Sequence, residues 1–327
     1  MRPAFSVLFL TTLIGAGQGL LMALVTGQFY FVIGAGSEHE TGQFYALGSL
    51  VALALLAGGL VASFFHLANP QRAWRAATRW RSSWLSREVV MLPAVMGLTV
   101  IYGGVHALGW NPVLMTFSNG KALELSMAVG FAAAGASLLL FLCTGMIYAC
   151  VRFVREWASS WTVVNYTLMG LASGFTLAAA YAATTGSLLR DFLTGDALAL
   201  TVLAMATRGF QIWRNERLKC RSSLKSAIGV HHDQIRQLTM GFMGGSFNTT
   251  EFRAPGGPET VRGLTVFFLL TGFLAPALLL AAAWGTTGQP LLLATAFVSQ
   301  YAGLFTERWV FFAAGTHVQN LYYQARA

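Results

Sequence analysis

The sequence predicts an all-α, polytopic membrane protein, and three observations support this class. Hydrophobic residues make up 55% of the 327 residues and charged residues only 10%, with a mean hydropathy of +0.59, whereas ordinary soluble domains carry about 25% charged residues. The apolar residues form runs as long as the roughly 20 residues that a helix needs to cross the hydrocarbon core. They do not form the short alternating segments of a membrane β-barrel. The composition therefore excludes a soluble globular enzyme.

Eight apolar runs, each bounded by charged or turn residues, predict eight transmembrane helices. They cover residues 5–34, 43–66, 88–109, 122–151, 161–185, 192–212, 263–284 and 290–313. The first run is longer than the apolar core of a signal peptide, so we expect a retained helix. Small residues such as Gly15 and Gly135 indicate close helix packing, and Pro276 predicts a kink in the seventh span. We expect two packed four-helix bundles within a single integral membrane domain, residues 1–327.

Basic residues are distributed unevenly between the two sides of this topology. With an even number of spans both termini lie on one side, and that side holds 19 of the 21 Lys and Arg residues, all except Lys121 and Arg190. Because positively charged short loops stay cytoplasmic, we expect both termini and the arginine-rich loops in the cytoplasm. The net charge of +9 is thus mainly a topology signal and does not indicate nucleic-acid binding.

The three cysteines, Cys143, Cys150 and Cys220, show no CxxC or other metal-ligand spacing. We therefore expect this chain alone to hold no iron–sulfur cluster and no structural zinc, and we predict no metal site in it. Any clusters that pass electrons would belong to another subunit.

The longest connection, residues 213–262, is a predicted cytoplasmic loop that docks a partner protein. Loops of this length without a function are uncommon, and the apolar residues in it are too few to cross the membrane. A small interfacial helix is the alternative. The expected docking residues are Phe242, Phe247, Asn248, Glu251 and Phe252.

Ionisable residues in or near the membrane are costly and are therefore functional candidates. Several converge on the predicted cytoplasmic side, where His66 and Arg72 follow the second span and Glu88 begins the third. A quinone site needs hydrogen-bond donors for the carbonyls, a group that exchanges protons with water, and an apolar cleft for the tail. A histidine and a glutamate can meet the first two needs, so we predict a quinone site around His66 and Glu88.

These residues also have purely structural interpretations. Ser86 is a possible N-cap with Glu88 in the first turn, and His66 can simply terminate a helix. Glu307 and Arg308, near the end of the eighth span, are adjacent and do not face each other on a helix. Each of them is therefore expected to pair with another neighbour.

Haem binding is a further alternative. His66 and His317 are expected at similar depth on the same side, and two imidazoles can ligate a b-type haem.

Several segments resemble the membrane-anchor subunit of the dimethyl sulfoxide reductase family. Residues 66–75 are HLANPQRAWR and residues 80–88 are WRSSWLSRE, close to the family's H-L-G-x-P-x-R-A and L-S-x-E patterns. The segment ERWVFF at 307–312 is also similar. Within the family, GGSFNTTEF at 244–252 and HVQNLYY at 317–323 look most like the anchors of cytoplasm-facing sulfite dehydrogenases.

The resemblance implies a three-subunit complex in the cytoplasmic (inner) membrane of a bacterium. One partner is the catalytic subunit with a molybdenum bis-pterin cofactor, the other is a ferredoxin-like subunit with iron–sulfur clusters, and this chain binds ubiquinone or menaquinone. The family's quinol-linked histidine and glutamate correspond to His66 and Glu88, and Arg72 matches the motif arginine. Ala68 replaces the motif glycine, which would crowd a close backbone approach.

The expected function is electron transfer from sulfite to the quinone pool on the cytoplasmic side. This chain would perform only the quinone half of the reaction and carry no catalytic centre for sulfite. A quinol-oxidising anchor of a dimethyl sulfoxide reductase-type complex is one alternative, and a purely structural docking anchor is another. A small-molecule transporter is the alternative of a different class, disfavoured by the apolar centres of the spans.

Overall fold

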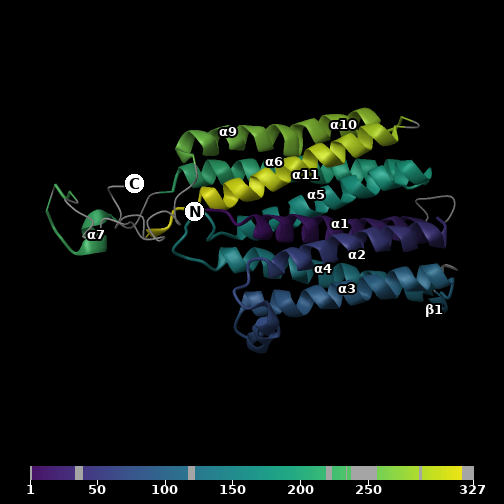
Figure 1. The fold of residues 1–327 in the computed structure, drawn as a ribbon. Helices are drawn as coiled ribbons and strands as arrows, with labels where there is room; N and C mark the ends of the chain where they lie inside the picture. The colour runs from purple at the N-terminus through teal and green to yellow at the C-terminus, as the bar shows by residue number, and fades with distance from the viewer. Residues whose placement is uncertain are drawn as a thin grey trace.

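The computed structural model describes residues 2–33, 40–116, 122–218, 223–232, 234–236, 256–286 and 289–318. Long helices run side by side along one common direction, and the short helix α7 (Leu224–Ile228) lies beyond one end of them (Figure 1). A small hairpin is the exception to this helical fold, with strands β1 (Val113–Thr116) and β2 (Ala122–Glu124) paired antiparallel.

Each of the eight predicted spans corresponds to a helical segment of the structure. These are α1 (Phe5–Ile33), α2 (Gly42–Phe64), α3 (Trp84–Leu108), α4 (Leu125–Ala149), α5 (Ser160–Thr185), α6 (Arg190–Glu216), α9 (Gly257–Leu269) continued by α10 (Ala275–Ala283), and α11 (Pro290–Ala313). In the described part of the chain, six of these segments are long and apolar enough to cross a membrane. The other two, α6 and α11, are as long but contain more polar and charged residues.

The seventh predicted span is one rod with an irregular centre. α9 and α10 are joined by a π-helical turn, Leu270–Leu274. Pro276 has no backbone N–H, so the carbonyl of Gly272 cannot be paired in the α pattern, and a π turn accommodates such a defect. The carbonyl of Thr271 accepts a hydrogen bond from Ser299 Oγ of α11 at 2.9 Å. A π turn therefore directly precedes Pro276, and the kink predicted there stays a prediction.

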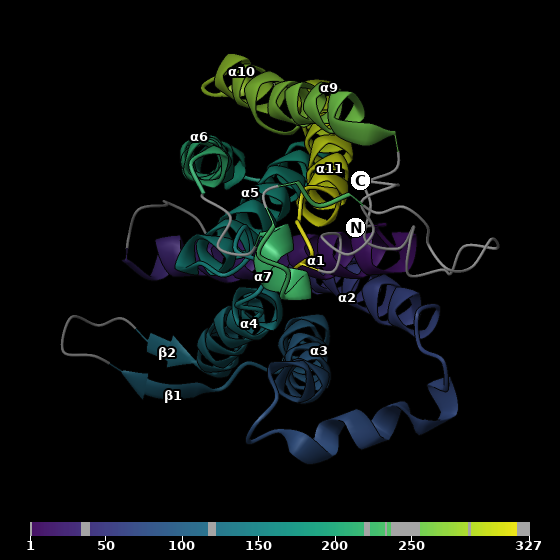
Figure 2. The same cartoon turned by 90° about the vertical axis from the view of Figure 1, so that its left-hand side faces the viewer.

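The helices form two groups that meet along α1 and α5 (Figure 2). The first group is α1 to α4, and the second is α5, α6, α9 with α10, and α11. At the junction, a Cβ atom on Gly19 or on Gly174 would overlap the backbone of the other helix, so only glycine allows this close approach. Gly15 packs against α5 as its predicted role requires, whereas Gly135 has open space around it and its predicted packing role is wrong.

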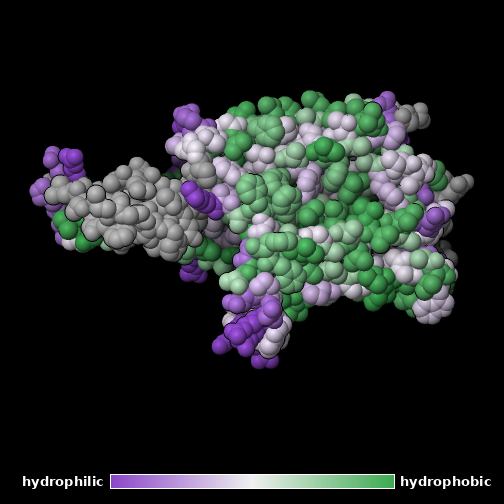
Figure 3. Space-filling view, in the orientation of Figure 1, coloured by the Kyte–Doolittle hydropathy of each residue, from purple (hydrophilic) through white to green (hydrophobic). Residues whose placement is uncertain are grey.

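The surface divides into an apolar flank and hydrophilic ends. Hydrophobic residues cover the sides of the long helices in Figure 3, and hydrophilic residues gather at the ends. The arginine-rich segment after α2 forms a 3-10 helix, Pro70–Arg79, which contains no buried residue and packs beside α3. This distribution is that of a multi-pass membrane protein, whose flank faces lipid and whose charged ends face water.

Candidate functional site, a cavity between charged side chains

A narrow cavity lies inside the bundle where its two groups of helices meet. Its free volume is about 30 Å³, room for about two water molecules. The lining residues come from α1, α3, α4, α5 and α11: Leu10, Thr11, Thr12, Ile14, Gly15, Gln18, Glu88, Phe141, Thr144, Tyr166, Met169, Gly170, Ser173, Tyr301, Leu304 and Arg308. Because Glu88 is near the start of α3 and Arg308 near the end of α11, the cavity is close to the arginine-rich end of the bundle.

Glu88 forms one polar side of the cavity. α3 begins at Trp84, where Ser83 Oγ accepts a hydrogen bond from the Ser86 amide at 3.4 Å and caps the helix. Ser83 is therefore the N-cap, and the interpretation of Ser86 as the cap is wrong. The extra turn directs Glu88 into the bundle, where it is 9% exposed and accepts a hydrogen bond from Thr144 Oγ1 at 2.5 Å.

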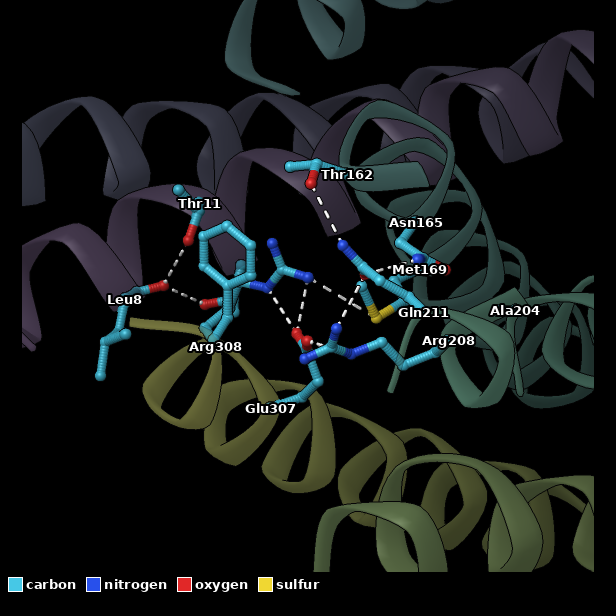
Figure 4. Close-up of polar contacts among 12 residues, drawn as sticks. Leu8, Thr11, Thr162, Asn165, Met169, Ala204, Arg208, Gln211, Glu307 and Arg308 are labelled. Atoms are coloured by element: carbon cyan, nitrogen blue, oxygen red, sulfur yellow. Dashed lines mark hydrogen bonds and ion pairs between the residues drawn. The ribbon is translucent and has the colours of Figure 1, made fainter. Parts of the chain in front are cut away.

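A buried cluster of three charged residues lies on the other side. The Glu307 carboxylate is fully buried and contacts two guanidinium groups, Arg208 Nε at 2.7 Å and Arg308 Nε and Nη2 at 2.6 Å (Figure 4). Arg208 reaches Glu307 from α6, and it is 4% exposed. Since an ion buried without a partner costs several kcal/mol, the three groups depend on one another.

Neutral side chains fix the position of Arg208. Arg208 Nη1 donates to Gln211 Oε1 at 2.8 Å, and Gln211 Nε2 donates to Thr162 Oγ1 at 3.1 Å. Asn165 Nδ2 donates to the same Gln211 oxygen at 2.8 Å. These bonds, drawn in Figure 4, join α5 to α6 around the ion cluster.

The ion cluster presents excess positive charge and unused donors to the cavity. It has two guanidinium groups for one carboxylate, and the guanidinium carbon of Arg308 lies 3.8 Å from the ring centroid of Tyr166. Arg308 Nη1 and the Tyr166 hydroxyl are buried and make no well-aligned hydrogen bond among the described residues, although Arg308 and Tyr148 lie within reach of this hydroxyl. The cavity thus offers donors on one side and the Glu88 carboxyl on another, with apolar side chains such as Leu304 in its wall. This arrangement suits a small ligand with two polar ends.

Two predictions about these charges are wrong. Arg308 does pair with Glu307, because its long side chain folds back onto the neighbouring carboxylate. Arg208, counted among the basic residues of the predicted cytoplasmic side, is instead buried inside the bundle.

His66 and Arg72 lie outside the cavity. α2 ends at Phe64, and His66 follows as an exposed residue whose pKa is lowered by partial desolvation. Arg72 is an exposed residue of the 3-10 helix. Of the predicted quinone-site residues, only Glu88 lines the cavity. A part for His66 and Arg72 in quinone binding stays a prediction.

Other predicted residues are also separate from the cavity lining. His317, beyond α11, is partly exposed and packs edge-on against Phe153, with ring centroids 5.2 Å apart; haem ligation by His66 and His317 stays a prediction. Within the described ranges, no group of three His, Cys, Asp or Glu side chains could hold a metal ion. The predicted docking residues lie outside the described residues; they are Phe242, Phe247, Asn248, Glu251 and Phe252.

Comparison with known proteins decides the family. Residues 2–316, nearly the whole chain, match the model of the DMSO reductase anchor subunit (DmsC) family. The chain belongs to this family. It is also 48% identical over 329 residues to the sulfite dehydrogenase C-subunit of Allochromatium vinosum, an alignment that covers 100% of both chains. The resemblance inferred from the motifs is therefore confirmed. The chain is a membrane-anchor subunit of a molybdoenzyme complex.

Proposed function

We propose that this chain is the quinone-reducing membrane anchor of a molybdenum and iron–sulfur enzyme that oxidises sulfite. The cavity carries the proposal, because the Glu88 carboxyl shares it with two donor-bearing side chains, Arg308 and Tyr166. The full-length identity of 48% to a sulfite dehydrogenase C-subunit supports sulfite as the substrate of the complex.

The polar groups of the cavity suit the two carbonyl oxygens of a quinone ring. Arg308 Nη1 and the Tyr166 hydroxyl would donate hydrogen bonds to one oxygen and stabilise the negative charge that reduction brings to it. The Glu88 carboxyl would give a proton to the other oxygen and regain one from water. Because the free volume of about 30 Å³ is smaller than a quinone ring, binding would require lining side chains to move.

The overall reaction divides between subunits. A catalytic subunit with a molybdenum bis-pterin cofactor would convert sulfite and water to sulfate, two protons and two electrons. The iron–sulfur clusters of a ferredoxin-like subunit would supply the path for these electrons to this chain. Quinone then takes up two electrons and two protons at the site that this chain provides.

We infer eight membrane crossings, with α6 and α11 included. The charged residues Arg208, Glu307 and Arg308 are buried against one another and so would not face lipid. The distribution of basic residues favours the cytoplasm for both termini and for the end near the cavity. The partner subunits would dock there, with residues 213–262 as part of the docking surface.

His66 and Arg72 are proposed to support the site from outside the cavity. Both are exposed residues that follow the end of α2, at the end of the bundle where α3 begins. His66 would act there as a neutral hydrogen-bonding imidazole at pH 7, because partial desolvation lowers its pKa.

The Glu88→Gln variant of the whole complex tests the proposal. We expect sulfite-dependent reduction of a quinone analogue to fall by at least about 100-fold, the low end of what a positioned proton donor contributes. Sulfite oxidation with ferricyanide, which bypasses the quinone, should be unchanged. Glu124→Gln is the matched control, because this carboxylate bonds to Asn111 outside the cavity. Full quinone-linked activity in Glu88→Gln would show that the site is wrong.

A quinol-oxidising anchor is the second candidate function, favoured by the description of the matching family as a DMSO reductase anchor subunit. The same cavity would then act in reverse, with Glu88 accepting a proton from quinol. Assays of the purified complex separate the two functions. Sulfite oxidation supports the first, whereas reduction of dimethyl sulfoxide by quinol supports the second.

A further inference from the structure

The cavity approaches the molecular surface on one side. Thirteen of its sixteen lining residues are buried, and the three partly exposed ones, Leu10, Thr11 and Tyr301, all lie on α1 or α11. Glu88 and Arg308, by contrast, are buried. The shortest way from the cavity to the outside of the bundle therefore runs between α1 and α11.

Weak contacts close this seam. Thr12 Oγ1 of α1 and the Tyr301 hydroxyl of α11 share a hydrogen bond of 3.1 Å. One helical turn farther along α11, the ring of Phe305 lies 4.8 Å from the ring of Phe9 and 6.4 Å from that of Phe5, measured between centroids. α1 contains no charged residue, so no ion pair joins it to α11. One hydrogen bond and aromatic contacts can break and re-form without loss of the fold.

The outer side of the seam is apolar. Phe5 is 62% exposed and Phe9 43% exposed, and both rings belong to a helix that is apolar along its whole length. In a membrane these rings would meet lipid chains rather than water. α1 also packs more closely on α2 and α5 than on α11. The α1–α11 seam is thus the less tightly packed side of α1.

We propose that quinone enters and leaves the cavity between α1 and α11, through a gate formed by Tyr301 and the Phe9–Phe305 pair. This inference rests on the proposed quinone function of the cavity. An isoprenoid tail stays in the hydrocarbon, so the ring must arrive from the side of the bundle. Rotation of Tyr301 away from Thr12 would open the seam, and the tail would then lie between Phe9 and Phe305 while the ring reaches Glu88.

Cross-linking the gate tests this route. Phe9→Cys and Phe305→Cys are introduced into a complex whose anchor has Ala at Cys143 and Cys150 and Ser at Cys220, and the pair is joined by a short bis-maleimide. We expect quinone-linked sulfite oxidation to fall at least tenfold on cross-linking, while the ferricyanide rate is unchanged. The reference for this tenfold fall is the quinone-linked rate of the same double-cysteine complex before the bis-maleimide is added.

A second aromatic pair provides the matched control. Phe29 of α1 and Phe131 of α4 have ring centroids 5.7 Å apart, and both are exposed, but neither lines the cavity. Cross-linking Phe29→Cys to Phe131→Cys should leave quinone-linked activity unchanged. If the Phe9–Phe305 cross-link is equally harmless, the gate is wrong. If the control cross-link is equally inhibitory, any cross-link that holds α1 rigid lowers the activity. That result also overturns the gate.

A Phe9→Ala, Phe305→Ala variant gives a readout that does not need cross-linking. We expect the KM for a quinone with a long isoprenoid tail to rise several-fold and the KM for a tail-less analogue to stay the same. Equal changes for both substrates would contradict contact between the tail and these rings. The Glu88→Gln result separates the two proposals. If Glu88→Gln loses quinone-linked activity and the Phe9–Phe305 cross-link does not, only the gate is wrong. If both keep full quinone-linked activity, the quinone site is wrong.

Discussion

The two groups of helices each bring one buried carboxylate to the region of the cavity, and the surroundings of these carboxylates differ. Glu307, in the second group, contacts two guanidinium groups. Glu88, in the first group, has one neutral partner, the Thr144 hydroxyl. Two cations already contact the Glu307 carboxylate, whereas the Glu88 carboxyl accepts one described hydrogen bond and so has capacity left for a ligand. The difference assigns a structural role to Glu307 and proton exchange to Glu88.

A charged residue inside the membrane is therefore not by itself evidence of a functional site. Arg208 and Glu307 form an ion pair of 2.7 Å that joins α6 to α11. Arg308 has a structural role and a proposed ligand-binding role. Its Nη2 and Nε contact Glu307, while Nη1 has no hydrogen-bond partner among the described residues. The groups proposed to react are those that can still form a hydrogen bond to a ligand after their contacts within the protein are counted.

The largest effect, a loss of stability, should come from removing the negative charge of Glu307. Glu307→Gln leaves two buried guanidinium groups without a counter-charge, which costs about 3–5 kcal/mol. We expect loss of the anchor from membranes or a strong fall in the thermal unfolding temperature of the purified complex. Glu88→Gln, in contrast, should change stability by less than about 1 kcal/mol, the value of one neutral hydrogen bond. Equal stability losses in the two variants would remove the distinction between them.

Arg308→Lys should have the next largest effect. Lysine keeps the charge but lacks the planar fork that can contact Glu307 and still direct Nη1 toward the cavity. We expect quinone-linked kcat/KM to fall by about tenfold, because a hydrogen bond to a charged group contributes about 1.5–3 kcal/mol. Arg190→Lys, at the first residue of α6 and outside the cavity lining, is the control and should leave quinone-linked kcat/KM unchanged. A fully active Arg308→Lys enzyme would argue against this donor.

Tyr166→Phe separates function from stability more finely. The Tyr166 hydroxyl makes no well-aligned hydrogen bond among the described residues, although Arg308 and Tyr148 lie within its reach. We expect its removal to lower the unfolding temperature only slightly. The quinone KM should rise about three- to tenfold, as expected for one neutral hydrogen bond to the ligand. Tyr181→Phe should do the opposite, because that hydroxyl donates to the Phe44 carbonyl at 2.8 Å. An unchanged KM in Tyr166→Phe would place the quinone elsewhere.

The smallest effect is expected for Thr144→Val. Valine keeps the shape of threonine but removes the one hydrogen bond that orients Glu88. We expect a two- to fivefold fall in quinone-linked kcat, consistent with a bond of about 0.5–1 kcal/mol, and no effect on the ferricyanide rate. A loss as large as that of Glu88→Gln would mean that Thr144 takes part in proton transfer itself.

The helices were predictable because the bilayer demands long apolar segments, and each predicted span corresponds to a helical segment. The errors occur where charge is buried rather than exposed. Arg208, counted among the basic residues of the predicted cytoplasmic side, forms an ion pair with Glu307 inside the bundle. A single sequence cannot distinguish such an arginine from one that flanks a loop. The contact of α1 with α5 depends on glycines such as Gly19 and Gly174, whose spacing does not identify their partner helix.

The candidate site was only partly predictable. Glu88 could be found because a carboxylate near the hydrocarbon is costly. Thr144 and Tyr166 could not, because hydroxyl side chains are inexpensive in helices and often bond to their own backbone. His66 stands out in the sequence motif, but it follows the end of α2 and is absent from the cavity lining. Which polar groups share a cavity depends on helix packing, and residue type alone does not determine that packing.

Redox-induced infrared difference spectroscopy on the purified complex tests the central claim most directly, because it detects protonation changes of individual carboxyl groups. We expect reduction of the bound quinone to perturb the signal of a protonated carboxyl group. This signal should disappear in Glu88→Gln and persist in the Glu124→Gln control. A carboxyl signal that persists unchanged in Glu88→Gln would contradict the assignment of Glu88 as the proton-exchanging group.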